Sequence, residues 1–195
     1  LENLPKKGPA IVVSNHRSYL DILVLSAALP RRGPWLVRRL VFIAKKELLK
    51  VPLLFGWLMR LAGAIFIDRN NRAKDALAAA DELVRVLELL RKGRSVLIFP
   101  EGTRSRSGEL LPPFKKGIAA FRLALKAGVP IVPVVIVSGT EELEPKNEAG
   151  KLLRLARKKG PVTVRVLPPI PLDPEDIKEL AERLRDILVQ ALEEL

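Results

Sequence analysis

Short apolar runs alternate along the chain with longer segments in which apolar residues recur every three or four positions. The short runs are rich in Val and Ile and predict strands at residues 10–13, 40–44, 64–67, 95–99, 131–137 and 162–167. The longer segments predict helices at residues 18–29, 52–62, 77–90, 117–126 and 174–195. Gly93 and Gly128 follow two of these helices, and glycine commonly ends a helix at such positions.

This order of elements predicts an α/β fold, with a mostly parallel or mixed central sheet flanked by helices. The length of 195 residues fits a single domain over residues 1–195. In such sheets, functional sites form in loops beyond the carboxyl ends of the strands. Two predicted loops in that position, at residues 14–21 and 99–108, carry unusual sets of polar side chains.

The composition limits the chemistry of such a site. The chain has no Cys, which excludes disulfides, thiol nucleophiles and cysteine-based zinc clusters, and it has a single histidine, His16. One His and no Cys leave no recognisable metal-ligand cluster, so neither a metal nor another cofactor is expected. Lys and Arg total 34 against 22 Asp and Glu, a net charge of +12 that favours anionic partners. Nucleic acid, acidic membranes and phosphorylated small molecules all fit that charge, but aromatic residues are only 5% and no nucleic-acid-binding motif is present.

The longest apolar stretch, at residues 51–67, contains Pro52 and Arg60. It falls short of the roughly 18–20 apolar residues that a membrane-spanning helix requires. Any contact of this chain with a membrane is therefore expected to be peripheral.

His16 and Asp21 lie in the first of the two loops. Ser18 and Asp21 have the spacing of a capping box just before an apolar run, which places His16 immediately before the helix. A His oriented by a carboxylate is a suitable general base. Asp21 as a simple helix cap, with His16 incidental, is the competing interpretation. No G-x-S-x-G nucleophile motif is present, so a base at His16 would deprotonate a substrate hydroxyl directly.

The second loop, after the predicted strand at residues 95–99, combines Arg104 and Arg106 with three hydroxyl side chains and two glycines. Guanidinium groups bind phosphate oxygens in pairs, hydroxyls add donors, and glycines allow close approach of the backbone. Glu101 is the one anion and could orient Arg104 or accept hydrogen bonds from a polyol. A solvated turn is the alternative interpretation.

Together, these segments resemble the glycerolipid acyltransferases related to 1-acylglycerol-3-phosphate acyltransferase. Residues 15–21 (NHRSYLD) resemble the N-H-x-S-x-x-D motif of that family, and residues 99–105 (FPEGTRS) match its F-P-E-G-T-R-S block. Three further blocks are similar and stand in the same order: residues 42–48 (FIAKKEL), 63–69 (GAIFIDR) and 129–134 (VPIVPV). The resemblance covers most of residues 9–137, and it carries no recognised motif beyond that.

The resemblance implies transfer of a fatty acyl group from acyl-CoA or acyl-carrier protein to the free hydroxyl of a lysophospholipid. It makes His16 the base and Asp21 its orienting partner, without a covalent intermediate. Arg69 would assist acceptor binding, and Lys45 would steady the oxyanion or the phosphate. Contacts with the acceptor's phosphate and glycerol fall to five residues of the second loop: Glu101, Gly102, Thr103, Arg104 and Ser105.

Members of this family usually carry an N-terminal hydrophobic or amphipathic anchor, and only 14 residues precede Asn15 here. The expectation is a chain without that anchor, held peripherally on the cytoplasmic face by an anionic membrane surface. Basic pairs would make this contact. The apolar segment at residues 51–59 would either join them, pack in the core or line a channel for the acyl chain. Two alternatives stay open: acylation of glycerol-3-phosphate or another lysophospholipid, and a catalytically silent module that binds anionic lipid.

Overall fold

The computed structural model describes residues 3–5, 8–17, 21–29, 40–45, 64–67, 75–101, 105, 110, 115–138, 161–172 and 176–195. Within them, all the predicted strands form and join one six-stranded sheet in the order β3-β2-β4-β1-β5-β6. The strands are β1 (Ile11–Ser14), β2 (Leu40–Lys45), β3 (Ala64–Ile67), β4 (Ser95–Ile98), β5 (Ile131–Ser138) and β6 (Val162–Val166). The first five pair in parallel, and β6 runs antiparallel to β5. The predicted mixed α/β fold is confirmed.

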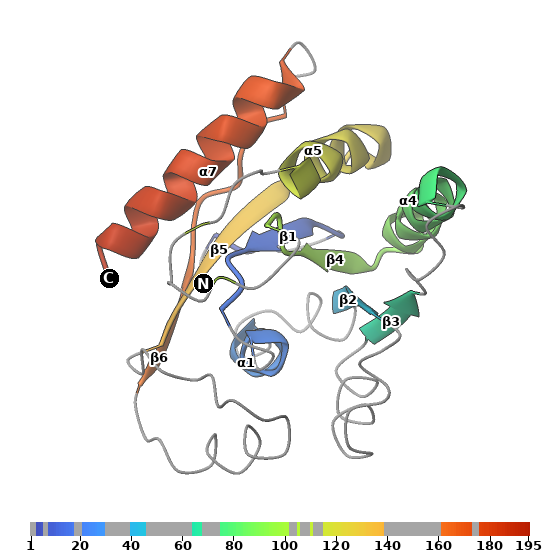
Figure 1. Ribbon diagram of the computed structural model, residues 1–195. Helices are drawn as coiled ribbons and strands as arrows, with labels where there is room; N and C mark the ends of the chain where they lie inside the picture. The colour runs from blue at the N-terminus through green and yellow to red at the C-terminus, as the bar shows by residue number, and fades with distance from the viewer. Residues whose placement is uncertain are drawn as a thin grey trace.

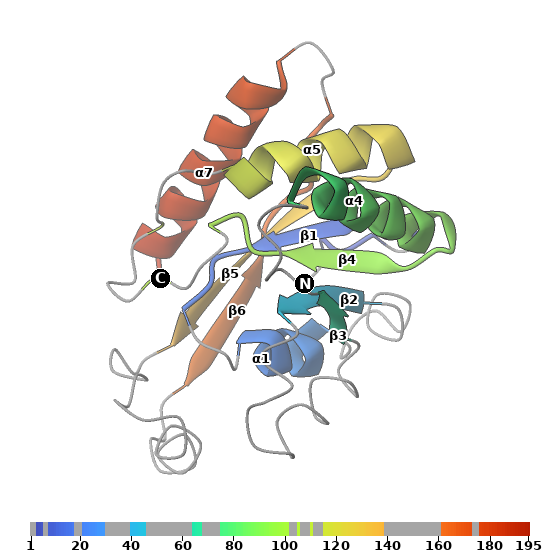
Figure 2. The same ribbon diagram turned by 45° about the vertical axis from the view of Figure 1, so that its right-hand side comes forward.

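Four helices accompany the sheet in the described part of the chain: α1 (Asp21–Ala28), α4 (Asp75–Arg91), α5 (Lys115–Ala127) and α7 (Ile177–Glu193). Figures 1 and 2 show α4, α5 and α7 on one face of the sheet and α1 on the other. Alternation along the strands explains the two layers, because successive side chains point to opposite faces. On β1, Ile11 and Val13 pack with α5 and α7, whereas Val12 packs with α1.

The predicted helix ends at Gly93 and Gly128 are confirmed. Both glycines have positive φ, at 73° and 63°, which L side chains rarely adopt. After α4, the N–H of Gly93 donates to Leu90 and that of Arg94 to Leu89. This pair of hydrogen bonds is the Schellman motif, which satisfies carbonyls left over at the end of a helix.

Some predicted boundaries were wrong. The last helix begins at Ile177 and not at residue 174, because the Asp176 side chain caps it by accepting the N–H groups of Lys178 and Glu179. Not every apolar residue of α4 faces the core, since Val84 is 54% exposed. Val86 is buried instead and lies about 200° around the helix from Val84. The helix predicted at residues 52–62 lies outside the described residues.

Strands β1 and β4 mark the point where the topology reverses. They are parallel neighbours in the centre of the sheet, with Val13 opposite Ile98. The helix after β1 packs on one face and the helix after β4 on the other. Loops that leave neighbouring strands toward opposite faces form the usual binding position of open α/β sheets. Among the described helices, none is long and apolar enough to cross a membrane.

Asn15 extends β1 by one more pair of hydrogen bonds. The strand's backbone pairs with β5 as far as Ser14, opposite Val134. The Asn15 side chain, buried at 2% exposure, then donates to the Ile136 carbonyl at 3.0 Å and accepts the Ile136 N–H at 2.8 Å. The amide therefore stands in for a peptide group and holds the residue before His16 against β5.

Asn15→Leu is expected to lower the free energy of unfolding by about 2–4 kcal/mol, because a buried N–H and a buried C=O of Ile136 lose their partners. Denaturant titration measures the loss. Asn3→Leu is the matched control, since Asn3 makes one hydrogen bond, to the Val166 carbonyl, in a part-buried setting. Equal losses in the two variants would contradict this account of Asn15.

Candidate active site

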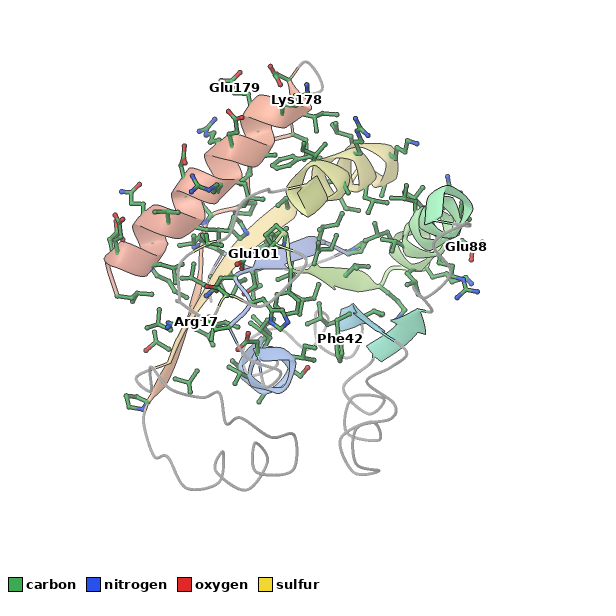
Figure 3. The ribbon with its side chains drawn as sticks, viewed as in Figure 1. Arg17, Phe42, Glu88, Glu101, Lys178 and Glu179 are labelled. Carbon is green, nitrogen blue, oxygen red and sulfur yellow. The ribbon has the colours of Figure 1, made fainter. Side chains whose placement is uncertain are left out.

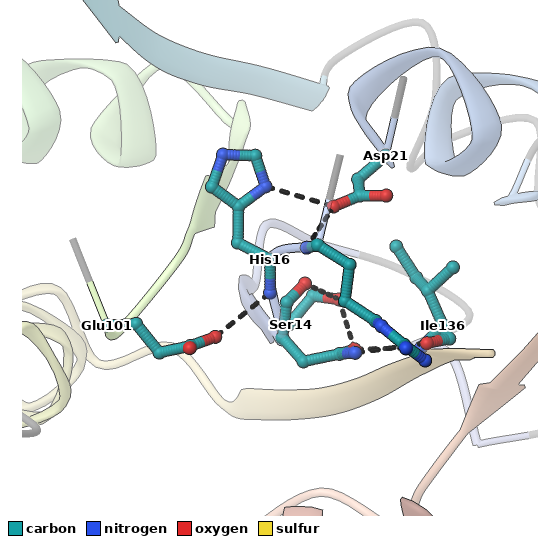
Figure 4. Close-up of polar contacts among 7 residues, drawn as sticks. Ser14, His16, Asp21, Glu101 and Ile136 are labelled. Carbon is teal, nitrogen blue, oxygen red and sulfur yellow. Dashed lines mark hydrogen bonds and ion pairs between the residues drawn. The ribbon is translucent and has the colours of Figure 1, made fainter. Parts of the chain in front are cut away.

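His16 and Asp21 form the centre of the site. His16 follows the carboxyl end of β1, and Asp21 is the first residue of α1. The imidazole Nδ1 lies 2.9 Å from Asp21 Oδ2, with the His side chain 15% and the Asp side chain 6% exposed (Figure 4). Because a carboxylate only accepts hydrogen bonds, a neutral imidazole in this contact has its proton on Nδ1 and its lone pair on Nε2. This is the tautomer that a general base at Nε2 requires.

The same carboxylate oxygen also accepts a backbone hydrogen bond from the segment that precedes α1. Asp21 Oδ2 accepts the N–H of Arg17 at 2.7 Å. One oxygen atom of Asp21 is therefore bonded to the His16 side chain and to the Arg17 backbone, and the predicted helix cap stays a prediction. Ser18, the predicted cap residue, lies outside the described residues, and the backbone N–H that Asp21 is seen to bind is one position earlier.

Glu101 comes from the loop after β4 and contacts the backbone of His16. Its Oε1 accepts the His16 N–H at 3.0 Å. Ser105, from the same loop and 4% exposed, donates its own N–H to the His16 carbonyl at 2.8 Å. Both backbone hydrogen-bonding groups of His16 are thus bound to the second predicted loop. The sequence had suggested that Glu101 orients Arg104 or binds a polyol, and a contact with His16 was not foreseen.

Figure 3 shows Glu101 and Arg17 in the middle of the molecule, between α1 and α5. Lys178 and Glu179 lie at the outer end of α7, well away from them. The residues that surround His16 therefore come from the carboxyl ends of β1 and β4, the position that the topology favours.

Phe99 was missed as a site residue. Its ring stacks on the imidazole of His16, with 4.0 Å between ring centroids and 16° between ring planes. Phe99 comes directly after β4, and His16 comes two residues after β1. The register of Val13 opposite Ile98 brings the two rings together. The presence of an aromatic residue at a predicted strand end was the available signal, but the register was not readable from the sequence.

The structure describes only some of the remaining predicted site residues. Lys45 is the last residue of β2, in register with Ile67 of β3, so it stands at the same edge of the sheet as His16. Four others lie outside the described residues, and their roles stay predictions: Arg69, Gly102, Thr103 and Arg104. In the described part of the chain, no group of three His, Cys, Asp or Glu side chains could hold a metal ion.

The arrangement fits removal of a proton from a bound hydroxyl. The serine nearest in sequence before His16, Ser14, is fully buried, and its hydroxyl donates to the Asn15 carbonyl at 3.2 Å. Among the described side chains, no serine hydroxyl is hydrogen-bonded to the imidazole, as a Ser–His nucleophile pair would be. In such a reaction His16 would accept the proton, and the attacking oxygen would come from the substrate.

Comparison with known proteins identifies the family of the chain. The family profile described as Acyltransferase matches residues 1–137. The 1-acyl-sn-glycerol-3-phosphate acyltransferase of Saccharomyces cerevisiae is 40% identical over 199 residues, which cover 100% of this chain and 58% of that protein. The human 1-acyl-sn-glycerol-3-phosphate acyltransferase alpha is 41% identical over 196 residues, covering 99% of this chain and 62% of that protein.

A solved structure gives the same result for the fold. The crystal structure of the 1-acyl-sn-glycerophosphate acyltransferase PlsC from Thermotoga maritima superimposes with a TM-score of 0.66 at 30% identity. The match covers 100% of this chain and 69% of that one. The chain thus spans about six-tenths of the length of the two curated relatives named above. With a matching profile over most of its length and the His–Asp pair in place, the chain belongs to the acyltransferase family.

Proposed function

We propose that this chain transfers a fatty acyl group from acyl-CoA or acyl-carrier protein to the free hydroxyl of 1-acylglycerol-3-phosphate, producing phosphatidic acid. The observation that carries the proposal is the 2.9 Å contact between His16 Nδ1 and Asp21 Oδ2, which leaves Nε2 as the base. The names of the relatives from yeast, human and Thermotoga maritima support the choice of acceptor.

The proposed reaction begins when Nε2 takes the proton of the acceptor hydroxyl. The oxygen attacks the thioester carbonyl carbon, and the carbonyl electrons move to its oxygen, giving a tetrahedral oxyanion. The oxyanion collapses, the new ester forms, and the carbon–sulfur bond breaks. The imidazolium then gives its proton to the departing thiolate. Asp21 stabilises the imidazolium throughout, and Lys45, at the edge of β2, is the proposed partner of the oxyanion or the phosphate.

Recognition of the acceptor is assigned to the loop after β4 together with Arg69. Arg104 and Arg69 would bind the phosphate, because guanidinium groups pair with phosphate oxygens. Gly102, Thr103 and Ser105 would supply further contacts. The loop is bonded to the His16 backbone at 3.0 Å through Glu101 and at 2.8 Å through Ser105. A phosphate held by this loop would therefore place its glycerol hydroxyl at a set distance from the base.

Attachment to the cytoplasmic face of an anionic membrane completes the proposal. The acceptor is a lipid, and the net charge of +12 attracts an acidic bilayer surface. The basic pairs at residues 6–7, 31–32 and 38–39 are the proposed contacts.

His16→Ala is expected to lower kcat by about 10²- to 10⁴-fold, the usual contribution of a general base. Asp21→Asn is expected to lower kcat as well, because the neutral amide no longer stabilises the imidazolium. Release of thiol from acyl-CoA in the presence of 1-acylglycerol-3-phosphate measures both. The protein adds no thiol background, because it has no cysteine.

Asp186→Asn is the matched control for Asp21→Asn. Asp186 lies on α7, and its side chain is 76% exposed. The Asp186→Asn variant should therefore be as active as the wild type. Wild-type activity in His16→Ala would overturn the proposed base.

A panel of acceptors tests the substrate. We expect the highest kcat/KM with 1-acylglycerol-3-phosphate. Glycerol-3-phosphate lacks the acyl chain, and lysophosphatidylcholine lacks the free phosphate, so both should give lower values. A higher value with either competitor would replace the assigned acceptor while leaving the acyl transfer itself in place.

Flotation with vesicles tests the membrane partner. Binding is expected to phosphatidylcholine vesicles that contain phosphatidylglycerol, and not to phosphatidylcholine alone. It should weaken between about 0.1 M and about 1 M salt, as the Debye length falls from about 10 Å to about 3 Å. Stronger binding to an oligonucleotide than to the anionic vesicles would contradict this. Vesicle binding without thiol release for any acceptor would favour the catalytically silent module.

A further inference from the structure

Phe99 covers one face of the only histidine in the chain. The ring centroids are 4.0 Å apart and the planes are 16° from parallel, so the two rings lie face to face. The edge of the imidazole is held separately, by Asp21 at Nδ1. Together these two contacts determine both the position and the tilt of the ring, which a single hydrogen bond at one nitrogen does not.

The contact between Phe99 and His16 has an electrostatic side as well. The face of an aromatic ring is negative, and a cation above it is attracted. When His16 takes a proton, the positive charge that forms lies directly over this face. The Phe99 ring attracts the imidazolium more strongly than the neutral imidazole. The contact is therefore stronger in the transition state than in the ground state, and only such interactions speed the chemical step.

We propose that Phe99 is a positioning residue for catalysis, which holds the His16 ring in its reactive orientation and stabilises the imidazolium formed by proton transfer. The proposal rests on the proposed role of His16 as the base. It assigns to Phe99 a role toward the side chain of the base, whereas Gly102, Thr103 and Arg104 of the same loop are assigned to the acceptor.

The position of Phe99 agrees with this role. The ring is only partly buried and packs at the margin of the core cluster on the α1 side of the sheet. Phe42, in the same cluster, is 1% exposed and supplies the filling of that core. A phenylalanine needed only for packing would be expected in the position of Phe42.

The experiment compares Phe99→Leu, which removes the ring, with Phe99→Tyr, which keeps it. Phe99→Leu is expected to lower kcat about tenfold while KM stays near the wild-type value, because the ring acts on the charge that forms during the reaction. Phe99→Tyr should restore most of kcat. Thiol release gives the kinetics, and NMR of the single histidine gives a second readout without assignment ambiguity.

In the NMR spectrum, the ring protons of His16 should be shifted upfield by the Phe99 ring current. This shift should be lost in Phe99→Leu and kept in Phe99→Tyr. Phe42→Leu is the matched control, because it removes a ring from the same core cluster. It should lower the thermal midpoint without moving the histidine signals or the kcat of the folded protein.

Two results would overturn the proposal: histidine signals that are the same in Phe99→Leu and wild type, or a kcat in Phe99→Leu equal to that of the wild type. Failure of the proposed function gives a different pattern, in which His16→Ala stays active or the wild type releases no thiol. The NMR comparison needs no turnover and still decides whether Phe99 holds the ring.

Discussion

The parallel pairing of β1 with β4 is the constraint on which the rest of the site depends. Parallel neighbours end at the same edge of a sheet, so the loops that follow them begin side by side although they are far apart in sequence. One loop carries His16 and the other carries Phe99, Glu101 and Ser105. A shift of the register by one residue would turn these side chains toward opposite faces. The contacts of His16 with Phe99, Glu101 and Ser105 therefore rely on the order of strands in the sheet.

Buried polar groups concentrate at this edge of the sheet. Among the described residues, five polar or charged side chains are buried, and only Ser95 lies at the other end of a strand. The four at this edge are Ser14, Asn15, Asp21 and Ser105. Such groups are costly to bury unless they are hydrogen-bonded, and a network in which each is bonded allows few other conformations. The local structure around His16 is consequently specified by polar contacts, whereas apolar packing specifies the layers of the fold.

The sequence alone predicted the strands and helices that the structure describes and the proximity of His16 to Asp21. Runs of Val and Ile, helical spacing and the two helix-ending glycines located the strands and helices of the described residues to within a few residues. The motif spacing brought Asp21 near His16, because both lie within one short segment. Contacts between distant segments were not predictable in this way. The stacking of Phe99 on His16, the hydrogen bond from His16 to Glu101 and the pairing of Asn15 with Ile136 all depend on the register of neighbouring strands. Local sequence patterns carry no information on that register.

The Asn15 side chain also affects the end of strand β5. Strand β5 continues to Ser138, four residues beyond the last one opposite β1, and it is this extension that pairs with β6. Where a buried strand outlasts its neighbour, its peptide groups need other hydrogen-bond partners, because an unpaired buried N–H or C=O is costly. By binding both peptide groups of Ile136, the amide supplies such partners. The β1 backbone is then free to turn away toward His16, so a single side chain keeps Ile136 hydrogen-bonded at the point where the chain leaves the sheet.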